Sequence, residues 1–485
     1  MPPKALIGID IGTTAVKAVM TDLAGQRLDA YAAGYPTARP HPAWVEQDPG
    51  DWLALVRAAL GQFARHGAIV QGIGVTSQVN THVFCAADLT PLAPAIVWQD
   101  GRAAAAGAGL QAAISPQARA DALGAPIPID ASHALARMAW MAAERPDIWR
   151  QTVQVMAPKD WVIAMLGGGL GADPIASVGL VGPDLCYAAP VIALLPGAAD
   201  RLPPLSDPLA GAGAVAMGPF AGVPLIRGTM DAWAAMFGTG VAREGQAMNL
   251  SGTSEVLGLI SAIRHPAPGA ITFPPWRGIT LHAGPTQSGG AALDWLGRII
   301  GLDAGPLADL AGPDPIAADA PLFLPHLQGE RAPLWDAGAR GVFAGLSASD
   351  GRPQMVRAVM EGVAFSARLA LEVLEVSGGI RPATIRAGGG GTASDRWCQI
   401  RADAFGRPLE RMAARDAGAV GALVLAGAGL GLMPDLADAA ARLVQTDRTF
   451  TPDPAAARLA DTRFALWRAL YDQIRPIHRG LQSQG

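Results

Sequence analysis

The chain has 485 residues, which is more than one hydrophobic core normally holds and predicts two or three domains. Half of the residues are hydrophobic and 16% are charged, a balance that argues against long disordered segments. The net charge is −4 and no basic block occurs, so no nucleic-acid partner is indicated.

The N-terminal segment begins Met-Pro-Pro-Lys and continues as a short apolar run that Asp10 interrupts. A secretory signal needs a longer apolar core without a carboxylate. The three cysteines, Cys85, Cys186 and Cys398, are too far apart for a disulfide framework or a metal knuckle. We therefore expect a cytoplasmic protein with reduced thiols.

The first elements form a β-meander, since apolar runs at 5–11, 15–22 and 26–34 are separated by glycine-containing turns. A helix is expected from Pro49 to about His66, because its apolar residues recur at helical spacing. A strand at 68–76 follows, and strands and helices then alternate. This order is typical of an α/β fold.

The pattern starts again in the second half, with expected strands at 224–227, 246–250 and 386–391. Two similar α/β halves are the simplest organisation, and we place their boundary near residue 242, giving domains 1–242 and 243–485. The uncharged stretch 417–433 nearly reaches membrane-spanning length. Its glycine and alanine content instead favours a tightly packed interior helix, so no membrane partner is expected.

The first chemical motif is Ile7-Gly8-Ile9-Asp10-Ile11-Gly12-Thr13-Thr14. A strand ends in a carboxylate, turns on a glycine and then offers two hydroxyls. Such a turn presents backbone N–H groups to an anion. Asp10 is placed to hold Mg²⁺ through water, because Mg²⁺ keeps several waters in proteins. The same pattern also fits a plain hairpin turn.

Two further glycine turns occur in the second half. Asn249-Leu250-Ser251-Gly252-Thr253-Ser254 runs from a strand into a Gly-Thr-Ser turn, about 240 residues after the first motif. Gly388 to Gly391 lie between a strand and a helix expected near Arg396. Glycines there let a phosphate or a flat ring approach the backbone, although a flexible loop is an alternative. Together the turns favour a bound nucleotide.

A carboxylate follows the strand at 224–227, in the run Gly228-Thr229-Met230-Asp231-Ala232. Phosphoryl transfer requires a group that orients the acceptor hydroxyl and accepts its proton. Asp231 fits that role, and an N-terminal helix cap is the alternative.

Taken in order, these motifs resemble the FGGY carbohydrate kinases of the actin-like ATPase superfamily, and xylulokinases most. The resemblance extends along essentially the whole chain. The residues that carry it lie at 7–17, 44–49, 98–102, 159–160, 228–231, 251–254, 323–333 and 341–361. It implies two ribonuclease-H-like domains around a hinged cleft, with the sugar mainly on the first domain and ATP mainly on the second.

The resemblance also implies a role for each matching residue. Asp231 matches the catalytic base and Asp10 the Mg²⁺-associated carboxylate. The positions that match nucleotide or phosphate contacts are Thr13, Thr14, Gly252, Thr253, Gly290, Gly389, Gly390 and Ser394. The positions that match the sugar site are Gln78, Val79, Asn80, Asp100, Arg102 and Asp231.

The sugar site departs from the xylulokinase pattern. Val79-Asn80-Thr81 stands where Met-His-Gly is usual, and Ala232 stands where Asn is usual. D-xylulose, converted to D-xylulose 5-phosphate, is the first expectation. L-xylulose, ribulose, erythritol and pentitols are the alternatives, because one lost hydrogen bond changes specificity strongly. His82, two residues after Asn80, is a candidate to supply the imidazole that the usual histidine provides. A structural role for His82 in the core or on the surface is an equal alternative.

A different function class is a non-catalytic sugar sensor on the same scaffold. Retention of Asp10, Asp231 and both phosphate turns favours the kinase. The sequence leaves open whether the chain forms a homodimer.

Overall fold

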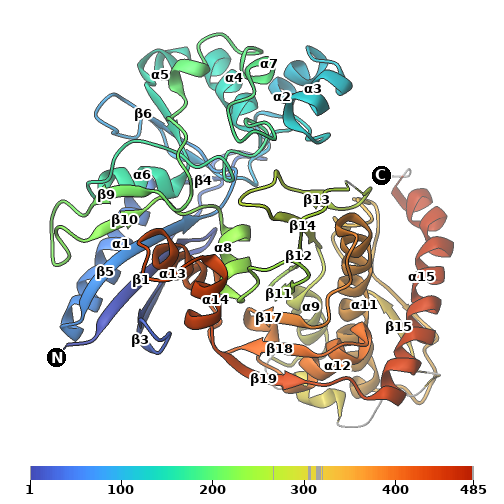
Figure 1. Cartoon of the computed structure of the whole chain (residues 1–485). Coiled ribbons are helices and arrows are strands. Elements are labelled where there is room, and N and C mark those ends of the chain that lie inside the picture. Colours follow the sequence, from blue (N-terminus) through green and yellow to red (C-terminus); the bar gives the residue numbers. More distant parts are fainter. Residues whose placement is uncertain (1, 266, 304–306, 313–317, 319, 483–485) are drawn as a thin grey trace. The chain divides into compact units, whose positions relative to one another are not determined.

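The computed structural model describes residues 2–265, 267–303, 307–312, 318 and 320–482. Its contacts divide the chain into two compact units. Unit 1 comprises Met1–Gly240 and Asp416–Val444, and unit 2 comprises Val241–Arg415 and Gln445–Gly485. Each unit combines one large β-sheet with helices (Figure 1), which confirms the predicted α/β class. The hinged cleft stays a prediction.

The large sheet of unit 1 has six strands in the order β3-β2-β1-β5-β10-β9. Their bounds are β1 Lys4–Ile11, β2 Ala15–Asp22, β3 Arg27–Gly34, β5 Ile69–Ser77, β9 Gly211–Ala214 and β10 Pro224–Ile226. The first three strands pair antiparallel, and β5 lies parallel to both β1 and β10. The predicted β-meander and the strand after the first helix are therefore confirmed.

Smaller elements complete unit 1. Two short ladders pair β4 (Glu46–Gln47) with β7 (Ala95–Ile96), and β6 (Val83–Cys85) with β8 (Gln154–Met156). The helices are α1 Pro49–Phe63, η1 Ala64–His66, α2 Ala104–Ala112, α3 Pro116–Leu123, α4 Ala134–Glu144, α5 Pro146–Gln151, α6 Pro158–Met165, α7 Ala189–Ile192, η2 Ala199–Arg201, α8 Asp231–Gly238, α13 Ala417–Gly429 and α14 Leu436–Leu443.

Helix α1 begins where the sequence predicts. The Asp48 carboxylate accepts a hydrogen bond from the Gly50 amide at 2.8 Å, and Pro49 occupies the first turn, where its missing N–H costs nothing. The apolar face buries Trp52, Val56 and Phe63 in the core with the sheet.

Helix α13 packs directly on the sheet of unit 1 and beside α8 (Figure 1). A Cβ atom on Gly8 of β1 would lie 1.9 Å from the Ala419 carbonyl oxygen, and one on Gly74 of β5 would lie 2.0 Å from the Ala422 carbonyl oxygen. Only glycine permits this approach. The stretch 417–433 is thus the interior helix that its composition predicts, and no helix in the described ranges is long and apolar enough to cross a membrane.

The same packing explains a difference from the predicted domains. A single boundary near residue 242 assigned residues 416–444 to the C-terminal domain, whereas they belong to unit 1. The chain returns because most of α13 is buried against α8, β1 and β5, which lie far earlier in the sequence.

Unit 2 contains a seven-stranded sheet in the order β13-β14-β12-β11-β17-β18-β19. Its bounds are β11 Ala247–Ser251, β12 Glu255–Ser261, β13 Ile271–Thr272, β14 Thr280–Pro285, β17 Ile385–Gly388, β18 Leu409–Met412 and β19 Thr446–Phe450, and a separate ladder pairs β15 Leu322–Leu324 with β16 Val342–Ala344. As in unit 1, an antiparallel strand pair leads into parallel strands.

The helices of unit 2 are α9 Gly290–Ile300, η3 Ala308–Ala311, α11 Arg352–Gly378, η4 Gly390–Thr392, α12 Asp395–Phe405 and α15 Pro454–Gln482. The long helix α11 packs against β12, β14 and β15 and against α9 and α12. It supplies Val359, Val363 and Leu374 to the buried cores of this unit.

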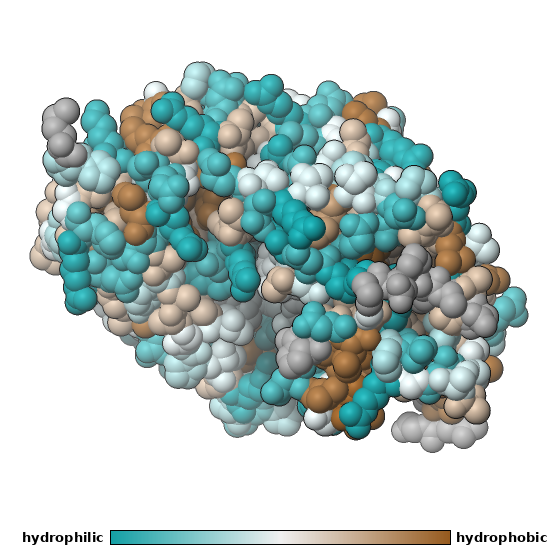
Figure 2. Space-filling view, turned by 90° about the horizontal axis from the view of Figure 1, so that it is seen from below, coloured by the Kyte–Doolittle hydropathy of each residue, from teal (hydrophilic) through white to brown (hydrophobic). Residues whose placement is uncertain are grey.

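On the face shown in Figure 2, hydrophilic residues predominate and hydrophobic residues gather in small patches. Exposed large apolar side chains include Leu466, Ile477 and Leu481 of α15. Small patches of this kind are normal on a protein surface and identify no partner. A homodimer therefore stays a prediction.

Candidate functional site

Asp10 lies at the end of β1, opposite Thr76 of β5. Its side chain is partly exposed, but its Oδ1 atom is buried and accepts no hydrogen bond from the part of the chain that the structure describes. Burial, the Asp231 carboxylate and the Asp416 carboxylate raise the pKa of Asp10 to about 7, while Lys17 opposes the rise. A buried carboxylate whose pKa is raised by neighbouring carboxylates is suited to a cation.

The start of α13 shapes the space around Asp10. A Cβ atom on Gly418 would lie 2.3 Å from Asp10 Oδ2, so glycine is required there. Asp416, which precedes the helix, pairs with Lys17 Nζ at 3.1 Å. No group of three or more His, Cys, Asp or Glu side chains has metal-binding geometry within the described ranges. An ion at Asp10 would therefore keep mostly water and phosphate ligands, as Mg²⁺ does.

Asp231 is the first residue of α8, so it is not the helix cap that was the alternative interpretation; Met230 takes the cap position. Its Oδ1 atom accepts a hydrogen bond from the Ala232 amide at 2.8 Å. Burial raises the pKa of Asp231 to about 6, although that hydrogen bond opposes the rise. A carboxylate with this pKa is ionised at neutral pH and is a stronger base than an exposed one.

The turn after β1 is closed by a hydrogen bond from the Gly12 amide to the Ala15 carbonyl at 3.1 Å. The Thr13 hydroxyl accepts from Trp98 Nε1 at 3.0 Å, and its carbonyl accepts from Gln47 Nε2 at 2.8 Å. Thr14 is exposed. Trp98 and Gln47 thus hold the turn in place, and the Thr13 hydroxyl can still donate its proton to an anion.

Gln78 follows β5 and lies beside this turn. Its amide donates to the Ile11 carbonyl at 2.9 Å, and its side-chain Nε2 donates to Gln47 Oε1 at 2.8 Å. Gln78 Oε1 is buried and has no hydrogen-bond donor among the described residues. Unit 1 therefore brings Asp10, Thr13 and Gln78 together at the ends of β1 and β5.

Asp100 and Arg102 are engaged with one another and with the protein. Arg102 Nη2 lies 2.7 Å from Asp100 Oδ2 and 2.9 Å from Glu46 Oε1, and its guanidinium lies 3.7 Å from the Trp44 ring centroid. Asp100 Oδ2 also accepts from the Val45 amide at 2.5 Å. Both side chains are almost fully buried, so the geometry favours a role in supporting the surrounding structure. Direct contact of Asp100 and Arg102 with the sugar stays a prediction.

Asn80 has a left-handed backbone with φ of 51°, and its side chain donates to Ser132 Oγ at 3.3 Å. Arg137 of α4 donates to the Asn80 carbonyl, to His82 Nδ1 at 2.9 Å and to the Val97 carbonyl at 2.6 Å. Burial and Arg137 hold the pKa of His82 well below its usual range. His82 is therefore a neutral ring anchored by Arg137, a contact that sequence reasoning missed.

In unit 2, the turn after β11 is locked by the start of α9. The Gly252 amide donates to the Ser254 carbonyl at 2.9 Å, and the Gly290 amide donates to the Gly252 carbonyl at 2.8 Å. The Ala291 amide donates to the Thr253 carbonyl at 3.1 Å. The structure thus brings together three predicted phosphate-contact residues from two separate motifs.

The glycine loop after β17 lies against the same turn. A Cβ atom on Gly389 would lie 2.4 Å from the Ser251 carbonyl oxygen, and one on Gly391 would lie 2.1 Å from Ser251 Oγ. A Cβ atom on Gly390 would meet nothing within 4 Å. Gly389 and Gly391 therefore allow close packing against Ser251, whereas Gly390 borders open space. Ser394 caps α12 by accepting from the Trp397 amide at 3.2 Å.

A buried ion pair connects these two segments, and sequence reasoning did not identify it. Arg401 Nη2 lies 2.5 Å from Glu255 Oε1 and donates to Ser251 Oγ at 2.7 Å, while Arg401 Nη1 donates to the Gly391 carbonyl at 3.1 Å. Both charged side chains are fully buried. Their spacing of 146 residues gives no sequence signal.

Known proteins share this architecture. The models of the N-terminal and C-terminal domains of the FGGY family of carbohydrate kinases match residues 5–179 and 247–430. A xylulose kinase from Escherichia coli is 29% identical, over 97% of this chain and 99% of the relative. A glycerol kinase from Gloeobacter violaceus is 30% identical over 97% of each.

Among solved structures, a gluconate kinase from Lactobacillus acidophilus superposes with a TM-score of 0.87 at 25% identity, covering 97% of this chain and 98% of the other. These relatives are named for three different acceptors, so overall similarity does not select one of them. The chain belongs to the FGGY family of carbohydrate kinases.

Proposed function

We propose that this kinase transfers the γ-phosphoryl group of ATP to a hydroxyl of a small ketose, with D-xylulose as the first candidate and D-xylulose 5-phosphate as its product. The observation that carries the proposal is a pair of carboxylates in unit 1: Asp10, whose buried Oδ1 atom has no hydrogen-bond donor among the described residues, and Asp231 at the start of α8. Burial raises their pKa values to about 7 and about 6. Kinase chemistry requires both a cation-binding carboxylate and a base, and these two side chains provide them.

Asp231 acts as the general base. Its carboxylate accepts the proton of the acceptor hydroxyl while the hydroxyl oxygen bonds to the γ-phosphorus and the bond to the β,γ-bridging oxygen breaks. ADP leaves with that oxygen, and the proton on Asp231 passes to solvent after the sugar phosphate departs. The raised pKa brings the base strength closer to neutral pH, where such a group is most effective.

Asp10 would hold Mg²⁺ beside the turn of Gly12 to Thr14. The buried and unpartnered Oδ1 atom fits that role. When bound, Mg²⁺ supplies neutralisation of charge on the β- and γ-phosphates. Thr13 donates its hydroxyl proton to a phosphate oxygen, and Trp98 keeps that hydroxyl oriented.

The nucleotide is bound by the residues of unit 2. Gly252 and Gly290 close the turn that receives its phosphates with their own amides. Thr253 donates its hydroxyl proton to a phosphate oxygen, and the N-terminal end of α9 contributes a favourable helix dipole. The adenosine lies against Gly390, where the protein itself leaves space.

The acceptor is selected at Gln78, Val79 and Asn80. A xylulose kinase is among the similar proteins, which makes D-xylulose a candidate. In this proposal the Asn80 side chain, a donor and an acceptor, replaces the histidine of the xylulokinase pattern. L-xylulose, ribulose, erythritol and pentitols remain the competing acceptors.

The test is a coupled ADP-release screen of the purified protein over ketopentoses, tetroses and polyols, with ATPase activity without acceptor as the background. The expected result is the highest kcat/KM for D-xylulose. Another acceptor that exceeds D-xylulose by about tenfold, or about 1.4 kcal/mol, would replace it while the kinase assignment stands.

A further inference from the structure

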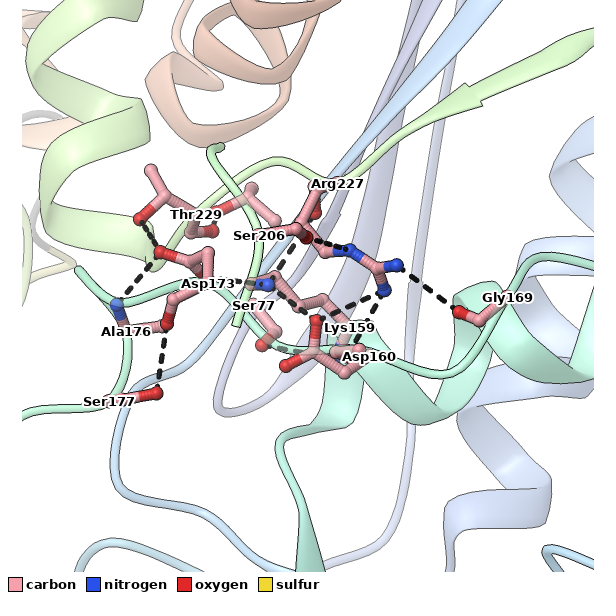
Figure 3. Close-up of polar contacts among 12 residues, drawn as sticks. Ser77, Lys159, Asp160, Gly169, Asp173, Ala176, Ser177, Ser206, Arg227 and Thr229 are labelled. Carbon is pink, nitrogen blue, oxygen red and sulfur yellow. Dashed lines mark hydrogen bonds and ion pairs between the residues drawn. The ribbon is translucent and has the colours of Figure 1, made fainter. Parts of the chain in front are cut away.

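Four charged side chains form a buried cluster in unit 1 (Figure 3). Lys159 Nζ lies 2.6 Å from Asp160 Oδ1 and 2.7 Å from Asp173 Oδ2, and Arg227 Nη1 lies 3.9 Å from Asp160 Oδ1. Burial lowers the pKa of Lys159, but the two carboxylates outweigh it and the pKa rises, so the ammonium group stays charged. The cluster therefore places two basic side chains beside two carboxyl groups, and burial raises the pKa of the Asp160 carboxyl.

A buried group of charges is seldom a gain in stability over apolar side chains of the same volume. Each charge must instead be held by its partners in a defined place. The cluster therefore matters for the segment that it holds in place, residues 227–230.

Asp173 holds the segment that leads into α8. The Thr229 hydroxyl donates to Asp173 Oδ1 at 2.8 Å (Figure 3). The Thr229 carbonyl accepts from the Thr76 hydroxyl at 2.5 Å. The Lys159 amide donates to Ser77 Oγ at 3.2 Å. The residues of the cluster thus connect the end of β5 with the segment after β10.

Arg227 fixes the other end of that segment. Its guanidinium donates to the carbonyls of Gly171 at 3.1 Å and Gly169 at 3.2 Å, and to Ser206 Oγ at 3.2 Å. The next residue, Gly228, has φ of 65°, and a Cβ atom there would lie 1.8 Å from the Val75 carbonyl oxygen. The hydrogen bonds of Arg227 and the close packing of Gly228 on β5 thus fix residues 227–230, immediately before Asp231.

We infer that Asp173 and Thr229, held by Lys159, are positioning residues that set the Asp231 carboxylate for proton transfer. The inference rests on the proposed role of Asp231 as the base. Thr229 is fully buried and only two residues from Asp231, so a shift of its backbone moves the carboxylate. A misplacement of about 1 Å in a reacting group costs roughly 10²-fold in rate.

The test compares Thr229→Val, which removes the hydroxyl at nearly constant volume, with Thr229→Ser, which keeps it. Thr152→Val is the matched control, because the Thr152 hydroxyl is also buried in unit 1 and donates to the Ile148 carbonyl at 2.9 Å. We expect kcat of Thr229→Val to fall by roughly 10- to 100-fold with both KM values within about twofold of wild type. Thr229→Ser should recover most of kcat, and Thr152→Val should lose Tm only.

Asp231→Asn is measured in parallel. If Thr229→Val retains wild-type kcat while Asp231→Asn is inactive, the positioning role is wrong and the base assignment stands. If Asp231→Asn retains wild-type kcat, both fail. If Thr229→Val does not fold, Asp173→Asn replaces it, and unchanged kcat in that variant would contradict the inference.

Discussion

The glycine loop after β17 provides a sharp test of the nucleotide site. Gly390 has open space around it, whereas its neighbours Gly389 and Gly391 are pressed against Ser251. Gly390→Leu should therefore fold normally and place a side chain where the adenosine is proposed to lie. Gly391→Ala should instead destabilise the fold, because its Cβ atom would lie 2.1 Å from Ser251 Oγ.

The expected size follows from contact area. A leucine that displaces the nucleotide from the loop removes about 100 Å² of apolar contact, which at about 25 cal/mol per Å² is about 2.5 kcal/mol. The KM for ATP should rise by roughly 50- to 100-fold, since each 1.4 kcal/mol is about tenfold. The KM for the sugar should change by less than about threefold, because the sugar-site candidates and the glycine loop belong to different units and share no residue.

The assay is initial-rate ADP release with ATP and sugar varied independently, accompanied by thermal melting of each variant. Gly480→Leu is the control, because a Cβ atom there also meets nothing within 4 Å and the residue lies in α15, away from the glycine loop in the sequence. Equal increases in both KM values for Gly390→Leu, or a wild-type KM for ATP, would refute an adenosine site at this loop.

Three further predictions concern the base, the acceptor and the buried ion pair. In a pH–rate profile, the acid limb of kcat/KM should lie near pH 6, because the Asp231 carboxylate is protonated and inactive as a base once the pH falls below its raised pKa. An acid limb near pH 4 would contradict the assignment of Asp231 as the base. Asn80→Ala should lower kcat/KM for the best ketose by about 1–3 kcal/mol, and an unchanged value in the same assay would exclude a sugar contact. Arg401→Met should lower the free energy of unfolding by about 3–5 kcal/mol, because it leaves Glu255 buried without its cationic partner. In denaturant unfolding, the double variant Arg401→Met with Glu255→Gln should regain part of that lost stability. A double variant that regains none of it would contradict the coupling between Arg401 and Glu255.

The elements near the motifs were predictable because their signals are local. The meander of residues 4–34 follows from alternating apolar runs and glycine turns, and α1 follows from its Asp48 cap and helical spacing. The interior position of α13 follows from its composition.

What the sequence could not predict depends on contacts between distant residues. The assignment of residues 416–444 to unit 1 rests on Gly8 and Gly74 meeting α13, and no local period encodes such a contact. Arg137 stands in an otherwise apolar helix segment, and a lone charge there was the available signal of its buried role. The family motifs include Lys159 and Asp160, but no local pattern shows that these residues meet Asp173 and Arg227 in one buried cluster.

The central claim is that Asp231 takes the proton of the acceptor hydroxyl. The most direct measurement is kcat of Asp231→Asn on the best acceptor from the ADP-release screen, with nucleotide binding followed by calorimetry. The substitution keeps the size of the side chain and an oxygen that accepts from the Ala232 amide. We predict that kcat falls by roughly 10²–10⁴-fold while MgATP affinity and Tm stay near wild type. A variant that folds, binds MgATP and retains near wild-type kcat would contradict the assignment.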